Sequence, residues 1–429
     1  MFIEFSIGNY LSFKEQVTFS MVASKIVAKD KTLDQNNVFK IDDDLSLLKS
    51  AAIYGANASG KSNFISALSF MRELVLNSSK ETQAAEPIET EAFRLDSAMA
   101  AQPSFFEMVF LLEGKKYRYG FEADTEKVVS EWLFFTPKTK EAKLFTRDSS
   151  GIALSGSFKE GKGIVERTRT NALFLSVVAQ FNGAIAERIL SWFRRLGIIS
   201  STVDLGIRNY TVKCLESDDV RSDIVKLIKR LDLGIDDFQI EKVKMIEATL
   251  PKNMPGDIKR RIPKNSPNKV SIRTLHKKYD SDGHNISAEM FDLDKNESDG
   301  TKKLFSLAGP LVDTLKHGNT LVIDELDARL HRLMTCEIIR LFNSNETNPH
   351  NAQLIFTTHD TSLLTNTLFR RDQIWFAEKK EAGATDLYSL AEFKVRNDAS
   401  YEKDYIQGRY GAVPFVGDIH RLVGDSNGQ

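Results

Sequence analysis

The chain has 429 residues, of which 41% are hydrophobic, and its 58 basic and 59 acidic side chains leave a formal net charge of −1. This length suffices for two or three domains with buried cores. Near neutrality excludes binding to nucleic acid or membranes through overall charge, so any such contact must be a local patch. Cys214 and Cys336 lack the spacing of a zinc site or a disulfide framework. Because no signal sequence and no run of about 18 apolar residues occurs, we expect a soluble, cytoplasmic protein without membrane contacts.

The first 163 residues predict a strand–loop–helix unit and an antiparallel sheet. Apolar and polar residues alternate in several segments, which is typical of half-buried strands, and one segment repeats apolar residues at helical spacing. In chain order, the expected elements are strands 2–7, 17–22 and 51–54, helix 61–78, a loose connection 80–102, strands 105–112, 116–122 and 128–135, and a hairpin tip or exposed loop 138–163.

The sequence after residue 163 predicts helices, then a hairpin, and then alternating strands and helices. Such alternation after residue 298 is typical of a parallel sheet. We also expect the last 50 residues to be ordered, because they contain Tyr401, Tyr405, Tyr410 and Phe415. In chain order, the expected elements are helices 185–196 and 220–231, strands 238–248 and 269–277, helix 302–316, strand 320–324, helix 328–342, strand 352–357 and a short helix after it.

The strongest motif is a phosphate-binding loop. Residues Gly55–Ser62 have the pattern G-x-x-x-x-G-K-S between a predicted strand and a predicted helix. Glycines at both ends let successive backbone N–H groups point at phosphate oxygens, and the following helix N-terminus adds its dipole. Lys61 would reach the β- and γ-phosphates, and Ser62 would bind Mg²⁺. The residues assigned to nucleotide binding are Gly55, Asn57, Ser59, Gly60, Lys61, Ser62 and Asn63.

Two later strands end in residues that would complete such a site. Strand 320–324 ends in Asp324 and Glu325, and strand 352–357 is followed by His359. Asp324 would hold Mg²⁺ through water, and Glu325 would polarise or orient the attacking water. His359 would hydrogen-bond the γ-phosphate, the alternative being a capping or surface histidine. The 35 residues from Asp324 to His359 leave room for one helix and the next strand of the same sheet.

A second candidate anion site lies 26 residues before Asp324. Ser298 and Gly300 stand at the start of a predicted helix, where free N–H groups and the helix dipole favour anions. An ordinary helix cap is the alternative if this segment is considered alone. In combination with the other motifs, we interpret it as a signature segment that closes on ATP bound by a partner subunit.

These motifs, in this order, resemble the ABC-type ATPase head that transporters, RecF, the SMC proteins and the OLD nucleases share. The resemblance implies an α/β fold in which a mixed sheet with a parallel core is joined by an antiparallel β lobe and an inserted helical and hairpin subdomain. Further segments resemble, more narrowly, the AbiL/RloA-like abortive-infection ATPases found in bacterial phage-defence loci. Those segments are residues 5–6, 9–15, 53–63, 171–176 and 408–414.

The resemblance also implies an ATPase with ATP and Mg²⁺ as cofactors, and a homodimer or higher oligomer held through its ATP sites. Lys61, Glu325 and His359 match its catalytic positions, and Ser62 and Asp324 its magnesium ligands. Ser298 and Gly300 match the signature pair.

One position departs from the ABC pattern, and two further features of that pattern, the glutamine loop and the adenine contact, have only candidate residues. Asp299 stands where the ABC pattern usually has Gly, and an anionic residue beside a phosphate site should weaken closure between subunits. The glutamine loop has two candidates, Gln102 and Gln180. By analogy only, Phe13 is expected to stack on the adenine.

We expect three regions along the chain. Residues 1–180 would form the N-terminal ATPase lobe, residues 181–296 a helical insertion, and residues 297–429 the C-terminal lobe. Within the insertion, segment 251–278 has six Lys and three Arg against one Asp, a net charge of +8. This segment could bind DNA or RNA phosphates, dock an acidic partner, or be a solvated basic loop.

The process that ATP hydrolysis would power has to be inferred from other features of the sequence, because ABC-type heads serve many functions. Only about 70 residues follow His359, too few for the Toprim nuclease domain of OLD proteins, and no long heptad array occurs. We therefore expect no nuclease domain in this chain. The favoured hypothesis is a regulatory ATPase of an antiphage system that controls a separately encoded, nuclease-like toxic effector. The alternatives are a RecF-like DNA-repair ATPase and, less favoured, a stand-alone enzyme with an unrecognised site.

Overall fold

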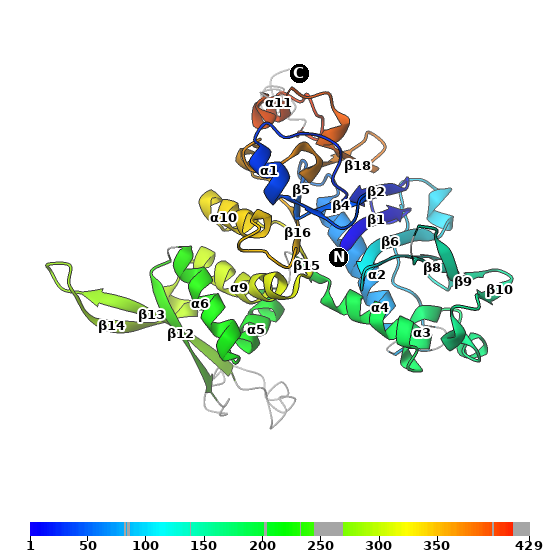
Figure 1. The fold of residues 1–429 in the computed structure, drawn as a ribbon, viewed down its shortest axis with the longest axis horizontal. Helices are drawn as coiled ribbons and strands as arrows, with labels where there is room; N and C mark the ends of the chain where they lie inside the picture. The colour runs from blue at the N-terminus through cyan, green and yellow to red at the C-terminus, as the bar shows by residue number, and fades with distance from the viewer. Residues whose placement is uncertain are drawn as a thin grey trace, which may run out of the picture. The chain divides into compact units, whose positions relative to one another are not determined.

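The structure is a computed structural model that describes residues 1–80, 83, 86–137, 139–200, 204–231, 233–243, 269–396 and 399–414 (Figure 1). The chain divides into two compact units. The first comprises Met1–Thr202, Thr314–Ala328 and Arg332–Gln429, and the second Val203–Asp313 and Arg329–His331.

These boundaries differ from the expected insertion 181–296. Helix α4 (Ala184–Arg195) belongs to the first unit, because its buried face packs against α2 (Lys61–Asn77) and α3 (Phe174–Gln180). At the other end, the second unit extends to Asp313, inside helix α9 (Asp299–His317). Ser298 and Gly300, the predicted signature residues, therefore belong to the second unit.

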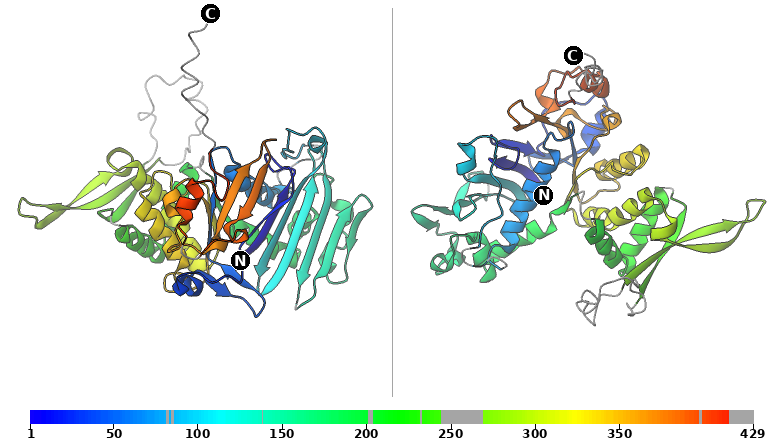
Figure 2. Two further views of the ribbon diagram at one scale, coloured as in Figure 1. Left: turned by 90° about the horizontal axis from the view of Figure 1, so that it is seen from above. Right: turned by 180° about the vertical axis from the view of Figure 1, so that it is seen from behind.

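The first unit contains a seven-stranded antiparallel sheet with the spatial order β10, β9, β8, β7, β6, β1, β2 (Figures 1 and 2). It confirms the alternating strands predicted up to residue 135. The segment 138–163, expected as a hairpin tip or loop, adds β9 and β10 to the sheet because Leu144 and Phe145 are buried in the core. The bounds are Phe2–Gly8 (β1), Val17–Ser20 (β2), Ser104–Leu112 (β6), Lys115–Ala123 (β7), Val128–Thr136 (β8), Ala142–Asp148 (β9) and Gly151–Leu154 (β10).

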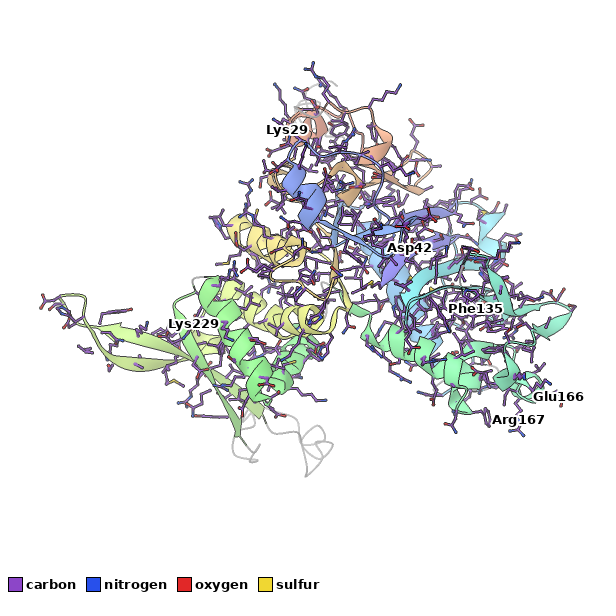
Figure 3. All side chains as sticks on the ribbon, viewed as in Figure 1. Lys29, Asp42, Phe135, Glu166, Arg167 and Lys229 are labelled. Carbon is purple, nitrogen blue, oxygen red and sulfur yellow. The ribbon has the colours of Figure 1, made fainter. Side chains whose placement is uncertain are left out.

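Aromatic side chains fill one face of this sheet. Tyr119 is fully buried, and the ring of Tyr117 stacks on Phe135 of β8 with the centroids 6.2 Å apart. Phe135 is labelled in Figure 3. The two tyrosines therefore serve sheet packing and do not form a platform for nucleic-acid bases.

A second, six-stranded sheet has the order β11, β15, β16, β5, β17, β18, in which the first five strands are parallel and β18 is antiparallel to β17. The sequence predicted β5, β15 and β16 but missed the other three strands. Strand β16 lies between β15 and β5, so Asp324 and His359 follow adjacent strands, as their spacing predicted. The bounds are Ser50–Tyr54 (β5), Gly197–Ile199 (β11), Thr320–Ile323 (β15), Gln353–Thr357 (β16), Ile374–Lys379 (β17) and Thr385–Ser389 (β18).

Helix α2 lies in a core that both sheets share. Its buried side chains belong to one apolar cluster with residues of the antiparallel sheet and with Val322 and Ile355 of the parallel sheet. The ring of Phe64, for example, meets Phe5 of β1 edge-on at 5.7 Å. The helix is therefore fixed from both sides, and the loop that precedes it is held at the carboxyl end of β5.

The remaining elements of the first unit are short, except for α10. This helix was expected at 328–342 but begins at Arg332, because Glu325 and Arg329 have positive φ angles of 52° and 63° and the chain turns between them. Tyr401, Tyr405 and Tyr410 are buried, which confirms the predicted order of the C-terminal segment up to residue 414. Phe415 and the residues after it lie outside the described residues. The bounds are Lys31–Asn36 (α1), Val38–Lys40 (β3), Ser46–Leu48 (β4), Arg332–Asn343 (α10) and Tyr401–Ile406 (α11).

The motif at residues 171–176 has a structural role. The carboxylate of Glu131, fully buried in β8, accepts hydrogen bonds from the backbone N–H groups of Phe174 and Leu175 at 2.7 and 3.0 Å, and from the Tyr119 hydroxyl at 2.9 Å. Glu131 thus satisfies two of the free donors at the start of α3. Burial raises the pKa of this carboxyl group, and Arg147, 3.8 Å away, opposes that shift.

The second unit combines helices with a three-stranded antiparallel sheet of order β12, β13, β14. The sequence predicted β12 and β13, and missed β14, which forms a long hairpin with β13 (Figure 1). Residues 244–268, and with them most of the basic segment 251–278, lie outside the described residues. The bounds are Asp204–Cys214 (α5), Asp218–Arg230 (α6), Ile235–Val243 (β12), Lys269–Tyr279 (β13), Asn285–Asp292 (β14) and Leu293–Asn296 (α8).

Among the helices that the structure describes, none has both the length and the apolar character that a bilayer-spanning segment requires.

Candidate nucleotide site

The predicted phosphate-binding loop lines a cavity of about 520 Å³ in the first unit. The loop begins directly after β5 and ends in the first turn of α2, which is the strand–loop–helix arrangement that the motif requires. The cavity brings the loop together with Glu325 and His359, which lie more than 260 residues farther along the chain. The lining residues are Ser12, Asn57, Ala58, Ser59, Gly60, Lys61, Ser62, Asn63, Glu325, His359 and Lys379.

Both glycines of the motif are required by close neighbours. A Cβ atom at Gly55 would lie 2.3 Å from the Ala377 carbonyl oxygen and 2.6 Å from Ser59 Oγ. Gly60 has a φ of 106°, and a Cβ there would lie 2.2 Å from Thr385 Oγ1. The loop is therefore pressed against β17 and β18, so that only glycine fits at either end.

The N-terminal segment supports the loop from a second side. Ser12 Oγ accepts hydrogen bonds from Asn63 Nδ2 and from Thr385 Oγ1, both at 2.7 Å. Thr385 Oγ1 also lies 2.8 Å from the Ser59 carbonyl oxygen, and Thr385 N–H donates to the Ser12 carbonyl at 2.7 Å. Ser12 thus joins the first helical turn, the loop and β18, which explains why the segment 9–15 accompanies the loop in the sequence pattern.

The C-terminal segment supports the loop from a third side. The backbone N–H of Ala56 donates to the Ala412 carbonyl at 3.0 Å, and the Tyr405 hydroxyl donates to the same carbonyl at 2.8 Å. The N–H of Ala412 donates to Glu378 Oε1 at 2.9 Å. Through these hydrogen bonds, residues 408–412 hold the start of the loop in place. No sequence pattern indicated this contact.

Lys61 is almost completely buried under the loop, with 5% of its surface exposed. Its ammonium group donates to the carbonyl oxygens of Gly55 and Ala56 at 2.7 and 2.9 Å. Desolvation lowers the pKa of Lys61 to about 8, and the carboxylates of Asp324, Glu325 and Asp327 oppose this shift. Lys61 therefore remains charged at neutral pH but is close to losing its proton.

The hydroxyl of Thr357 anchors the two predicted carboxylates. Thr357 Oγ1 donates to Asp324 Oδ1 at 2.6 Å and accepts the backbone N–H of Glu325 at 2.7 Å. Asp324 is 2% exposed, and Glu325 has the positive φ of 52° that this turn imposes. The arrangement directs Glu325 into the cavity, where its Oε1 lies 3.6 Å from His359 Nε2. Thr357 is thus a positioning residue at the end of β16 that the sequence analysis did not single out.

Replacement of Thr357 by Val is expected to lower ATP hydrolysis by about 10- to 100-fold, with ATP affinity changed less than threefold. Valine has nearly the same shape but cannot hold Asp324 or the Glu325 backbone. The measurement is steady-state hydrolysis together with equilibrium binding of ATP. Thr358→Val is the matched control, because Thr358 is equally buried but contacts neither carboxylate through its hydroxyl. Equal rates for both variants would contradict the anchoring role.

The predicted contact of Phe13 with adenine is wrong. Phe13 has no exposed surface and belongs to the shared apolar core, because the Tyr10–Phe13 turn directs its ring inward. Of the two glutamine-loop candidates, Gln180 lines a different cavity beside Arg188 and Arg194 of α4, and Gln102 is not among the residues that line the phosphate-loop cavity. Neither residue is placed by this structure to contact a nucleotide in that cavity.

Comparison with known proteins identifies the family of this chain. The family model described as "AAA domain, putative AbiEii toxin, Type IV TA system" matches residues 50–365, which include the loop, both carboxylates and His359. The chain belongs to this AAA-domain family. No curated protein matches the sequence.

Solved SMC heads are also similar to this member of the AAA-domain family. The SMC head domain from Thermotoga maritima is 14% identical with a TM-score of 0.41, over 90% of this chain and 98% of that one. An SmcHead bound to the C-winged helix domain of ScpA is 14% identical with a TM-score of 0.43, over 90% and 97%. The Smc head domain with an extended coiled coil bound to the C-terminal domain of ScpA from Pyrococcus furiosus is 12% identical with a TM-score of 0.41, over 95% and 98%.

The signature candidates of this AAA-domain protein lie in the second unit. Ser298 Oγ accepts the backbone N–H of Thr301 at 3.1 Å, and so caps the start of α9. A Cβ at Gly300 would lie 2.8 Å from the Arg329 carbonyl oxygen, which explains the glycine by close packing. Asp299 is paired with Lys302 at 3.6 Å, so its charge is partly balanced on its own helix.

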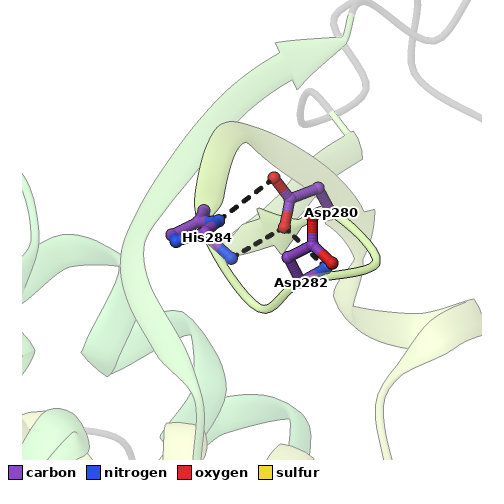
Figure 4. Close-up of side chains that lie close together, drawn as sticks. All are labelled: Asp280, Asp282 and His284. Carbon is purple, nitrogen blue, oxygen red and sulfur yellow. Dashed lines mark hydrogen bonds and ion pairs between the residues drawn. The ribbon is translucent and has the colours of Figure 1, made fainter.

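The turn between β13 and β14 of this protein carries an acidic pair that the sequence analysis did not single out. Asp280 and Asp282 form a D-x-D pair in the β13–β14 turn, close to His284 (Figure 4). All three side chains are exposed, and Asp280 Oδ1 accepts the backbone N–H groups of Asp282 and His284 at 3.0 and 2.8 Å. These contacts are those of an ordinary turn, in which an aspartate satisfies the backbone that follows it.

Proposed function

We propose that this chain binds and hydrolyses ATP with Mg²⁺ as an ABC-type ATPase. The observation that carries the proposal is one cavity in which a glycine-bounded loop, a buried lysine, Glu325 and a histidine meet, while Thr357 anchors Glu325 beside the buried Asp324. Lys61 and the loop N–H groups would bind the β- and γ-phosphates, and Ser62 with Asp324 would hold Mg²⁺. The metal would neutralise charge on the phosphates during transfer to water.

The two remaining residues have chemical roles in this proposal. Glu325 would orient and deprotonate the attacking water, because its carboxylate faces the cavity from a fixed turn. His359, 3.6 Å from Glu325, would hydrogen-bond the γ-phosphate and respond to its loss. Both groups come from neighbouring strand ends of one sheet, so the sheet itself sets their spacing.

The site would be completed by a second subunit. Ser298 and Gly300 provide a helix N-terminus suited to an anion, and they belong to a different compact unit from the loop. In a two-fold dimer, each subunit's signature segment would close on ATP held by the other. ATP binding would then join the two heads, and hydrolysis would release them.

For the cell, we propose that the chain is the regulatory ATPase of an antiphage, abortive-infection system and controls a separately encoded toxic effector. The family description, which names a putative toxin of a type IV toxin–antitoxin system, supports the toxin–antitoxin setting but not the division between regulator and effector. The regulatory role is supported by the sequence resemblance to abortive-infection ATPases. The opposing candidate remains a RecF-like ATPase that acts on DNA through the basic segment 251–278.

The deciding experiment is purification of the tagged chain expressed from its own operon, with and without MgATP, followed by native mass measurement. We expect a stable assembly with the product of a neighbouring gene, altered by ATP, together with growth arrest when that neighbour is expressed alone. A homodimer that carries nucleic acid, and whose ATP hydrolysis is stimulated by gapped DNA, would instead support the repair function. Growth arrest caused by this chain alone would contradict a purely regulatory role.

A further inference from the structure

Lys379 is a cation of the phosphate-loop cavity that the known motifs leave unexplained. It is the last residue of β17, which runs parallel to β5 with Trp375 opposite Ile53 and Phe376 opposite Tyr54. Strand β17 therefore reaches the same edge of the sheet at which the loop begins. The close approach of Gly55 to the Ala377 carbonyl shows that the loop lies directly against this strand.

The β17–β18 hairpin directs Lys379 toward the loop. Lys379 is paired across the hairpin with Thr385, and directly opposed residues of antiparallel strands project from the same face. The Thr385 hydroxyl lies 2.8 Å from the Ser59 carbonyl oxygen and 2.7 Å from Ser12 Oγ, so this face is the one that meets the loop. Lys379 itself is exposed and lines the cavity beside Ser12 and Asn57.

The next residue shows the opposite arrangement. Lys380 follows Lys379 in the chain and is not among the cavity-lining residues. Its ammonium group lies 3.0 Å from Asp386 Oδ2, so an aspartate of β18 balances its charge. The two lysines therefore differ in surroundings although they are adjacent in sequence.

The charges of the cavity suit a polyanion. Two lysines, Lys61 and Lys379, line it together with one carboxylate, Glu325. Lys61 is held beneath the loop by two carbonyl oxygens, whereas Lys379 lies at the exposed side of the same cavity. Electrostatic attraction to a lysine at this position increases with the charge of the ligand.

We propose that Lys379 is a second phosphate-binding lysine of this site, supplied by the β17–β18 hairpin of the same subunit, and that it favours nucleoside triphosphates over less charged nucleotides. The proposal rests on the proposed ATPase function. Lys379 acts on binding rather than on the hydrolytic step, because the water-activating groups come from the opposite side of β5, at the ends of β15 and β16. Its contribution to binding affinity is therefore largest for ATP, smaller for ADP and absent for adenosine.

The test is equilibrium binding of ATP, ADP and adenosine, measured by calorimetry on the full-length chain at low and high salt. Lys379→Gln should weaken ATP binding about tenfold, ADP binding about threefold and adenosine binding not at all, with the ATP effect reduced at high salt. Lys379→Arg should restore ATP affinity. Lys380→Gln, the matched control, should change ATP affinity less than twofold, and the thermal midpoints of the folded variants should agree.

The outcomes separate this inference from the proposed function. ATP binding by the wild type that Lys379→Gln leaves unchanged would overturn the role of Lys379 and leave the ATPase proposal intact. An equal loss for ATP and adenosine would also overturn it, because the residue would then support the fold rather than phosphate. Failure of the wild type to bind any nucleotide would instead refute the ATPase proposal on which the inference rests.

Discussion

Replacement of Glu325 by Gln is expected to lower the rate of ATP hydrolysis by about 10²- to 10⁴-fold while ATP binding persists. Glutamine retains the shape of the side chain but cannot accept a proton from water, and the Thr357 contacts to Asp324 and to the backbone of residue 325 remain. Single-turnover hydrolysis and equilibrium binding measure the two effects separately. Glu337→Gln on α10 is the control, since that carboxylate is paired with Arg340 at 2.6 Å and does not line the cavity. Hydrolysis by Glu325→Gln at the wild-type rate would refute the assignment.

The same variant should accumulate as an ATP-bound dimer, because the complex that hydrolysis normally releases would persist. Native mass at saturating MgATP measures this, and a monomeric Glu325→Gln would contradict the dimer proposal. The double variant Glu325→Gln, Ser298→Asp is the control that tests whether Ser298 contacts the partner's ATP. Aspartate caps a helix as well as serine does, but its charge would repel a phosphate bound by the partner. The double variant should therefore bind ATP and stay monomeric.

ATP affinity is expected to fall about tenfold between pH 7 and pH 9 because of Lys61. Burial lowers the pKa of this lysine to about 8 in the free protein, whereas phosphate oxygens would favour its protonated form. Below pH 8 the lysine is already charged, so binding requires no proton; above pH 8 each binding event must take one up, and affinity declines. Calorimetry in buffers of different ionisation enthalpy measures both the affinity and the proton uptake.

Two variants test whether Lys61 causes this decline. Lys61→Met should abolish detectable ATP binding, since it removes the charge from beneath the phosphates. Lys61→Arg keeps a permanent charge, so whatever affinity it retains should not change over this pH range. A wild-type affinity that stays constant from pH 7 to pH 9 would contradict the role given to the lysine.

The sequence by itself predicted which motif residues lie in and beside the candidate site. The motif Gly55–Ser62 requires a strand before it and a helix after it, and the apolar run that ends in Asp324 and Glu325 requires a buried strand, because local backbone geometry and periodicity fix both. The 35-residue spacing to His359 was enough to place that residue just after the neighbouring strand of the sheet. These inferences depend on residues that are near one another in the chain.

Only the tertiary structure decided which distant residues support that site. Thr357 holds the carboxylates, and Ser12, Thr385 and Ala412 support the loop, through hydrogen bonds between segments up to 373 residues apart. Such contacts leave no periodic pattern in a sequence. The same limit explains the error at Phe13, since an aromatic residue beside a loop has the same sequence signal whether its ring enters the core or the ligand site. Lys379 and Lys380 are likewise indistinguishable in sequence. The pairing of β17 with β5 and β18 separates them, because successive residues of an extended chain face opposite sides and Lys380 directly follows the strand.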